Sequence, residues 1–297
     1  MMDTKLLTLL TVVETKNFSL AAKRLNLTQP AVSQHIRSLE KEYDIRIFNR
    51  AGNDLKLTNE GETLVKYARK IDSLYDLMQD KIEDIKKKST TLKVGVTHTA
   101  ESTTIIDALA RLSSEMSGTN IKIISDTIKN LYDKLSNYDI DFAVVEGKVR
   151  DKKFSSILVD NDSLLVVTSP DSPLAKKSSL NIKDVMKEKL ILRSRGSATR
   201  SLFMDELDKK DLSLEDDFSV IMEIDNIATI KDLIRKGMGI SILPKSVCYD
   251  EIKNNTLKVL PIEDMTMTRE INIVYQKDSL DKELIGEILN KYRNLTR

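Results

Sequence analysis

Cysteine, tryptophan and glycine are scarce in this sequence, and the shortage of cysteine excludes the most. The 297 residues include one cysteine, Cys248, no tryptophan and nine glycines. A single thiol cannot form an intramolecular disulfide, and this usage is typical of a reducing compartment. We therefore expect a cytoplasmic protein that has neither a disulfide framework nor a paired-thiol redox switch.

Long apolar runs are missing as well. No stretch approaches the roughly 18 consecutive apolar residues that a membrane span needs. The N-terminus carries Asp3 and lacks a small-residue cleavage site, which is typical of the start of a helix rather than of a signal peptide. We therefore expect no membrane partner.

The chain also has no excess of either charge. Its 47 lysines and arginines and 46 acids leave a formal net charge of +1, so any surface for nucleic acid must be local. The two histidines, His35 and His98, and the one cysteine do not form a metal-binding pattern. Phosphate-binding glycine loops and nucleophile motifs are missing. We expect no metal, no cofactor and no enzymatic activity.

The first 43 residues contain three short helical patterns, in a chain whose length suits two or three domains. The first pattern has apolar residues on one face, at Leu6, Leu9, Leu10 and Val13. The second, residues 18–25, is expected to begin after Ser19 as N-cap and to end at Asn26, which tolerates a left-handed backbone. The third follows closely, with Thr28 as N-cap and Pro30 in its first turn. This spacing predicts a helix-turn-helix.

The third helix has two different faces. One is expected to be buried and consists of Val32, Ile36, Leu39 and Tyr43. The opposite face carries amides, a hydroxyl and an arginine, which are groups that pair with base edges in the major groove: Gln29, Pro30, Ser33, Gln34 and Arg37. Residues 15–39 contain no acid, which suits a surface that faces phosphates. We therefore predict that this helix, with its cap Thr28, binds double-stranded DNA.

The residues after this helix predict a β-hairpin, the wing of a winged helix-turn-helix. Apolar residues alternate on either side of a turn at residues 51–54, at Ile45, Ile47, Leu55 and Leu57. Arg50 and Lys56 are candidate contacts to phosphate or to the minor groove. The alternative for each of them is an ordinary solvated basic residue.

From Thr58, another expected N-cap, to Lys88 the sequence predicts one long helix without proline. Its apolar positions repeat at steps of four and three, as in a coiled coil: Leu64, Ala68, Ile71, Tyr75, Met78, Ile82 and Ile85. A helix of about 30 residues spans roughly 45 Å, which is too long to serve one small domain. We expect it to pair with a second copy, so that two recognition helices reach successive half-sites of a pseudo-palindrome.

The stretch FSLAAKRLNLTQPAVSQHIRSLEKEYDIRIFNR, followed by LKLTNEGETL, resembles the N-terminal domain of LysR-type transcriptional regulators over about residues 3–66. The resemblance implies that the exposed face of the third helix enters the major groove, with Arg50 on the wing. Two positions depart from the usual pattern: Thr28 replaces a serine, and Asp44 stands where a glycine is common. The family also implies a homodimer or a dimer-of-dimers tetramer, and a C-terminal domain that binds a small-molecule effector.

From Leu92 onward short β-branched runs alternate with helical stretches, which predicts mainly parallel α/β sheets. IDFAVVEG, SPDSPLA and KGMGISILP resemble the two-lobed effector domain of the family, which is similar to periplasmic binding proteins. The expected α/β multi-domain chain has a winged helix-turn-helix at 1–58, a coiled-coil linker helix at 59–90 and an effector domain at 91–297. Lobe I would comprise about 92–161 and 268–297, and lobe II about 162–267.

Parallel sheets bind ligands at the carboxyl ends of their strands, where helices begin. THTAEST follows the first strand of this region and supplies Thr97, His98, Thr99, Glu101 and Ser102. RSRGSATR follows a later strand and resembles a GSGTR-type anion cradle of the family, supplying Arg193, Ser194, Gly196, Ser197, Thr199 and Arg200. In this stretch Ala198 replaces the second glycine, and an ordinary capped helix start explains it equally well. Glu146, Asn226 and Thr229 are expected to complete the pocket.

These patterns predict a ligand-responsive transcription regulator whose effector is a small molecule, with an anion or a carboxylate favoured by the arginines. One alternative is an architectural DNA-binding protein whose α/β part is an oligomerisation scaffold. Another is an enzyme fused to a winged helix, which would need a nucleophile–base pair that the sequence does not display.

Overall fold

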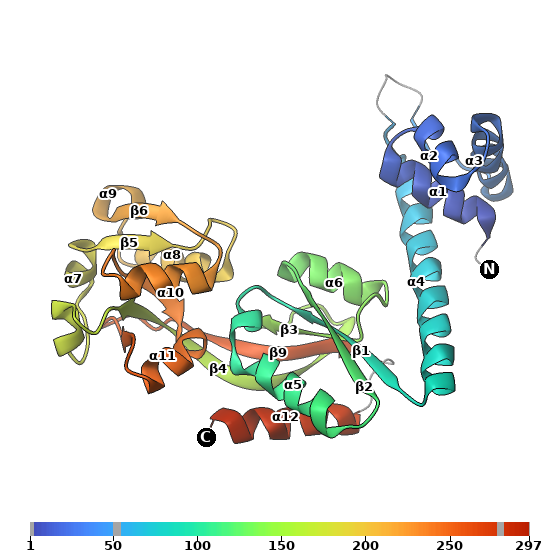
Figure 1. Ribbon diagram of the computed structural model, residues 1–297. Helices are drawn as coiled ribbons and strands as arrows, with labels where there is room; N and C mark the ends of the chain where they lie inside the picture. The colour runs from blue at the N-terminus through green and yellow to red at the C-terminus, as the bar shows by residue number, and fades with distance from the viewer. Residues whose placement is uncertain (1–2, 50–54, 278–281, 297) are drawn as a thin grey trace. The chain divides into compact units, whose positions relative to one another are not determined.

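The structure is a computed structural model, and it describes residues 3–49, 55–277 and 282–296. The chain divides into two compact units (Figure 1). The first comprises residues 1–91 and 133–140, and the second comprises residues 92–132 and 141–297. Each unit is described by itself.

The first unit contains the expected helix-turn-helix. Its helices are α1 (Thr4–Thr15), α2 (Phe18–Leu25), α3 (Gln29–Tyr43) and α4 (Asn59–Lys87). Apolar side chains of α1, α3 and the first turns of α4 share one core, in which Leu9, Leu39 and Ile47 are almost completely buried. The small residues Ala21 and Ala22 of α2 pack against Val12 and Val32, which brings α2 close to α1 and α3.

The ends of these helices follow from local side chains. Thr28 caps α3 by accepting a hydrogen bond from the Ala31 N–H (3.3 Å), and Asn26 ends α2 in the left-handed conformation (φ 55°), as expected. The predicted N-cap of α2, Ser19, is wrong. Asn17 is the cap, because its extended backbone lets the side-chain oxygen accept the N–H groups of both Ser19 and Leu20.

The buried stripe of α3 is shorter than the sequence suggests. Val32, Ile36 and Leu39 are buried, but Tyr43 is 50% exposed, so its assignment to the core is wrong. The helix ends at Tyr43 and Asp44 then turns the chain in the left-handed conformation (φ 51°). The apolar stripe therefore extends one turn beyond the core.

The base of the predicted wing is present. Phe48 pairs with Leu57 in an antiparallel bridge, and the Asn49 N–H donates to the Lys56 carbonyl oxygen at 2.8 Å. Arg50 and the turn at residues 51–54 lie outside the described residues. Next along the chain, Gly61 packs so closely on the wing that a Cβ atom there would lie 2.2 Å from the Ile47 carbonyl oxygen.

The second unit alternates strands and helices. Its elements are β1 (Thr90–Val96), η1 (Ala100–Ser102), α5 (Thr104–Glu115), β2 (Thr119–Ser125), α6 (Ile128–Ser136), β3 (Phe142–Glu146), β4 (Phe154–Thr168), η2 (Pro173–Lys176), α7 (Ile182–Met186), β5 (Lys189–Leu192), α8 (Ala198–Asp208), α9 (Leu214–Asp217), β6 (Ser219–Glu223), α10 (Ile227–Arg235), β7 (Ser241–Pro244), η3 (Lys245–Cys248), α11 (Tyr249–Lys253), β8 (Lys258–Leu260), β9 (Thr268–Gln276) and α12 (Lys282–Thr296). The division into units cuts two of these elements, because residues 90–91 of β1 and residues 133–136 of α6 belong to the first unit.

The strands form one sheet in the order β2-β1-β3-β9-β4-β7, with β8 beside β4, and a two-stranded sheet of β5 and β6. The pairs β1–β3 and β5–β6 are parallel. However, β9 is antiparallel to β3 and β4, and β4 is antiparallel to β7 and β8. The expectation of mainly parallel sheets is therefore wrong, because β4 and β9 are long return strands that run against their neighbours.

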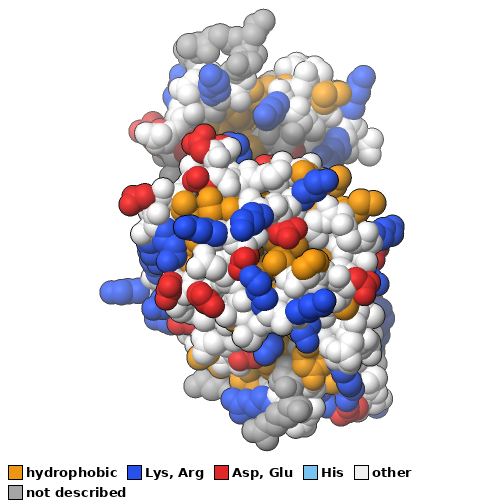
Figure 2. All heavy atoms as spheres, turned by 90° about the vertical axis from the view of Figure 1, so that its left-hand side faces the viewer, with side chains coloured by type: hydrophobic (Ala, Val, Ile, Leu, Met, Phe, Trp, Pro, Cys, Tyr) orange, Lys and Arg blue, Asp and Glu red, His pale blue; other side chains and the backbone are white. Residues whose placement is uncertain are grey.

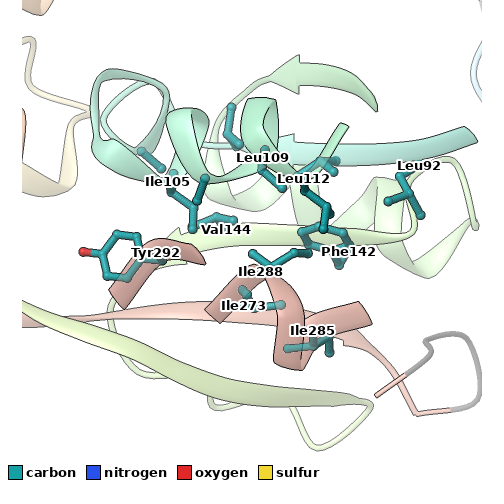
Figure 3. Packing of buried hydrophobic residues seen from close by; sticks show 14 of the residues in the cluster. Leu92, Ile105, Leu109, Leu112, Phe142, Val144, Ile273, Ile285, Ile288 and Tyr292 are labelled. Atoms are coloured by element: carbon teal, nitrogen blue, oxygen red, sulfur yellow. The ribbon is translucent and has the colours of Figure 1, made fainter. Parts of the chain in front are cut away.

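Two regions of buried apolar side chains lie along these long strands. The first combines residues of β1, α5, β3, β9 and α12, and Figure 3 shows Leu109, Phe142 and Ile288 among them. We refer to the surrounding residues 92–132, 141–161, 268–277 and 282–296 as lobe I. The second region lies within residues 162–267, which we call lobe II. Figure 2 views the outer face of lobe II, where basic and acidic side chains are interspersed rather than gathered by sign.

Candidate functional site

The predicted reading face of α3 is open to solvent. Gln29, Pro30, Gln34 and Arg37 are exposed, and Ser33 is half-buried and accepts a hydrogen bond from the Gln29 amide (3.0 Å). Among the described residues no carboxylate forms an ion pair with Arg37. By contrast, Arg24 is paired with Glu14 at 2.9 Å. Arg37 therefore presents its charge to solvent, and Lys56 on the wing is exposed as well.

His35 links α3 to α1 through its side chain. Its Nδ1 lies 2.9 Å from the Thr8 hydroxyl oxygen. The Thr8 hydroxyl also donates to the Thr4 carbonyl oxygen (2.8 Å), an arrangement that is compatible with donation from a protonated Nδ1 of His35 to Thr8. Sequence reasoning gave this histidine no role, because its partner lies 27 residues away.

The long helix α4 has an exposed apolar stripe beyond its first turns. Ile71, Met78, Ile82 and Ile85 are 46–77% exposed, and Leu74, which the repeat did not include, is 43% exposed. Tyr75 is half-buried. Leu64 and Ala68 instead pack in the core of their own chain, so contacts within one copy already account for these two residues.

The second unit has two neighbouring cavities where strands end and helices begin. One, of about 290 Å³, lies between the carboxyl ends of β1 and β3 and the first turns of α6 and α8. The other, of about 490 Å³, lies between η1 and the first turn of α10. His98 lines both. We call them the inner and the outer cavity.

A carboxylate of lobe I is held at the wall of the inner cavity. The Glu146 Oε1 accepts a hydrogen bond from the Thr97 hydroxyl at 2.7 Å, and Thr97 in turn accepts the Ala100 N–H. The Arg269 Nη2 lies 3.9 Å from the same Glu146 oxygen and 3.8 Å from the Asp162 Oδ2. These distances are too long for hydrogen bonds, so the pairing of Arg269 is electrostatic.

An arginine of lobe II lies at the same wall. The Arg193 side chain is 4% exposed, and burial lowers the pKa of its guanidinium below the usual value. Its Nη1 donates to the Thr99 hydroxyl at 3.5 Å, but its buried Nε has no hydrogen-bond acceptor and lies 3.7 Å from Asp225. Hydrogen bonds from Ser194 and the Arg193 charge lower the pKa of Asp225, so it stays ionised at neutral pH.

Two family models match this chain. One, described as the bacterial regulatory helix-turn-helix protein of the lysR family, matches residues 4–62. The other, described as the LysR substrate binding domain, matches residues 86–292, which is more than half of the chain. The chain belongs to the LysR family. It is therefore a DNA-binding transcription regulator that responds to a ligand, and its relatives are regulators rather than enzymes.

Relatives and solved structures of LysR-family regulators extend over almost the whole chain. The regulator CysL of Bacillus subtilis is 25% identical over 289 residues, which cover 95% of this chain and 94% of CysL. A helix-turn-helix regulator of Methanocaldococcus jannaschii is 27% identical over 268 residues, 90% of each chain. A structure of full-length CbnR with its target DNA superimposes with a TM-score of 0.68 at 16% identity and covers 98% of both chains. Full-length OxyR of Pseudomonas aeruginosa superimposes with a TM-score of 0.63 at 20% identity, and the match covers 98% of this chain and 97% of OxyR. Both structures share the fold.

Most of the predicted effector residues of this LysR-family regulator do meet at the two cavities. Those that line the inner cavity are Thr97, His98, Thr99, Glu146, Arg193, Gly196 and Ser197, and Glu101, Ser102 and Asn226 line the outer one. Ser197 and Asn226 also cap α8 and α10. RSRGSATR therefore contains the capped helix start that was the alternative to an anion cradle.

Four of the predicted effector residues do not line either cavity. Arg200 is buried and bonded to Glu223 at 2.6 Å, and Thr199 accepts a bond from Arg269. Ser194 bonds to Asp225, and Thr229 bonds to Asn226. Of these two predicted arginines, Arg193 and not Arg200 brings its positive charge to the cavity.

Sequence reasoning missed the contribution of α6. Asp126 and Thr127, which lead into the helix, and Ile128 and Lys129 in its first turn line the inner cavity. The signal was present, because Asp126 and Thr127 directly follow the strand pattern IKIIS. Asp162 and Arg269 had no such signal, since each acquires its partners from strands far away in the sequence.

The described residues contain neither a membrane-spanning helix nor a cluster of metal ligands. None of the helices there is both long and apolar enough to pass through a bilayer. Within the same part of the chain, no group of three or more histidine, cysteine or acidic residues could hold a metal ion.

Proposed function

We propose that this regulator works in the cytoplasm as a homodimer or a dimer of dimers, and that α3 of two copies reads a pseudo-palindromic DNA site. A small ligand with an anionic group, bound between lobes I and II, would set its affinity for that site. The proposal assigns DNA reading to residues 1–58, pairing to residues 59–90 and sensing to residues 91–297.

The observation that carries the DNA-reading part is the exposed face of α3. Its amides and Arg37 are available to solvent, and hydrogen-bonding groups of this kind distinguish base pairs in the major groove. One arginine and a few amides make a modest reading surface, so a single copy would bind weakly. The exposed apolar stripe of α4 supports the pairing that supplies a second copy.

The observation that supports the sensing part is the buried Arg193 at the inner cavity. A buried guanidinium N–H without an acceptor is costly, and an anionic ligand group would satisfy it. Because Arg193 belongs to lobe II and Glu146 to lobe I, a ligand in this cavity contacts both lobes and can change how they close.

Titration of a labelled duplex from the region upstream of its own gene tests the DNA-reading part. We expect affinity to fall steeply with salt and the Arg37→Ala variant to lose about 1–3 kcal/mol of binding free energy. Arg111→Ala is the control, since Arg111 is an exposed arginine on α5 in the other unit. Equal affinities of the two variants would refute the assignment of α3, and binding that no metabolite changes would favour an architectural role.

A further inference from the structure

We propose that the ligand of this regulator is a small zwitterion, with a carboxylate and an ammonium group in one molecule as in an α-amino acid. The inference rests on the proposed function, because it concerns the same cavity between the lobes. It goes further by adding a required positive charge to the ligand, which the arginine alone does not suggest.

The charges around the two cavities argue against a ligand that is only an anion. The inner cavity is lined by two acids, Asp126 and Glu146, and by two bases, Lys129 and Arg193. Two more acids, Glu101 and Asp225, line the outer cavity, and its described lining contains neither lysine nor arginine. Arg269 adds a third positive charge beside Glu146, but the carboxylates still outnumber the cations. This excess disfavours a dianion, whereas a ligand with its own cationic group relieves the repulsion.

The lobe II side of the inner cavity suits the carboxylate of the ligand. The Arg193 side chain is 96% buried and its Nε hydrogen has no acceptor. Gly196 and Ser201 lie at the same wall, where α8 begins at Ala198. The first turn of this 11-residue helix carries N–H groups without partners in the helix, and these favour an anion.

The lobe I side suits the ammonium group. The Glu146 side chain is 4% exposed, and one of its oxygens accepts from Thr97. Among the described residues no hydrogen bond reaches the other oxygen, Oε2. Arg269 is too distant to donate to Glu146 and also faces Asp162, so it neutralises Glu146 only in part. A buried carboxylate with a vacant acceptor atom favours an N⁺–H donor.

Carboxylate and ammonium subsites on different lobes would make lobe closure depend on both ends of the ligand. A molecule with only one charged group would satisfy one lobe and leave the other buried charge without a partner. The inner cavity, at about 290 Å³, is near the lower limit for ligand pockets, so the ligand is small.

Thermal shift and calorimetric titration of the full-length protein test the inference with matched sets of probes. Each set contains an α-amino acid, the corresponding acid without the amino group and the corresponding amine without the carboxyl group. Small dicarboxylates complete the panel. We expect at least one amino acid to raise the melting temperature and to bind at least tenfold more tightly than both of its truncated analogues.

The outcomes separate this inference from the proposed function. Binding of a monocarboxylate or dicarboxylate as tight as that of any amino acid would overturn the zwitterion and leave an anion-responsive regulator. Binding of amines alone would overturn both the zwitterion and the anionic group. If no probe of any class binds, sensing in this cavity fails together with the inference.

Two variants assign the ends of the ligand. Glu146→Gln should lower the affinity for the amino acid about tenfold or more, and should leave the affinity for its deaminated analogue unchanged or higher. The control Glu287→Gln, on the exposed face of α12, should alter neither affinity. Ser201→Ala removes an exposed hydroxyl at the carboxylate end and should weaken both probes severalfold to the same extent. If Glu146→Gln lowers the affinity for both probes equally, the ammonium site is contradicted. If Ser201→Ala lowers the affinity for neither probe, the carboxylate site is contradicted.

Discussion

At the scale of single residues, Gly61 shows how closely the wing and α4 fit. An added Cβ atom would lie 2.2 Å from the Ile47 carbonyl oxygen, which is backbone and cannot move aside cheaply. Gly286, in the interior of α12, has nothing within 4 Å of the same position. The two glycines therefore respond differently to one added methyl group.

Gly61→Ala should lower the free energy of unfolding by about 1–3 kcal/mol, because the wing must shift to accommodate the methyl group. Gly286→Ala should instead be neutral or raise it by about 0.5–1 kcal/mol, since alanine favours a helix interior. Urea unfolding followed by circular dichroism measures both. A Gly61→Ala protein as stable as the parent would contradict the close contact.

Cys248 is the other informative single residue. Its thiol is completely buried, and burial raises its pKa to about 12, so it is protonated and unreactive across the physiological range. The buried thiol is therefore not suited to act as a redox sensor.

Native protein at pH 7–8 should react with a thiol reagent such as DTNB at least about a hundredfold more slowly than the same protein in guanidinium chloride. The reaction should stay slow across this range, because burial raises the pKa of the thiol to about 12 and leaves little thiolate. The unfolded sample is the control for reagent and stoichiometry. Fast stoichiometric labelling of the folded protein would show that Cys248 is accessible.

At the scale of elements, the structure agrees best with the sequence where the signals are local. Thr28 and Asn26 mark the boundaries of α3 and α2 because caps act within a few residues. The return strands β4 and β9 could not be predicted, since their antiparallel partners are set by contacts between distant segments. For the same reason the places of Arg269 and Asp162 near the cavity could not be predicted from the sequence. Glu146 and Arg193 could be predicted, because they lie at the ends of strands.

The α4 stripe gives a prediction at this scale. Met78→Glu places a charge at a 48% exposed apolar position and should weaken self-association by about 2 kcal/mol or more, with a matching loss of DNA affinity. Gln79→Glu adds the same charge at the next, exposed position and should have little effect. Sedimentation equilibrium measures the difference. Identical association of the two variants would place the pairing surface elsewhere.

At the scale of the whole molecule, regulation requires a coupling free energy between the ligand cavity and the reading face. Ordinary couplings of about 1–3 kcal/mol change affinity roughly 5- to 150-fold. Because coupling is reciprocal, cognate DNA should change the affinity for the ligand by the same factor. Neither effect requires direct contact between the two units.

The most direct measurement is the affinity for the upstream duplex as a function of salt, without ligand and with a saturating amount of a ligand identified by thermal shift. The account predicts a steep salt dependence and a roughly 5- to 150-fold change in affinity when the ligand is added. Salt-independent binding, or a ligand that stabilises the protein and leaves its affinity for DNA unchanged, would contradict it.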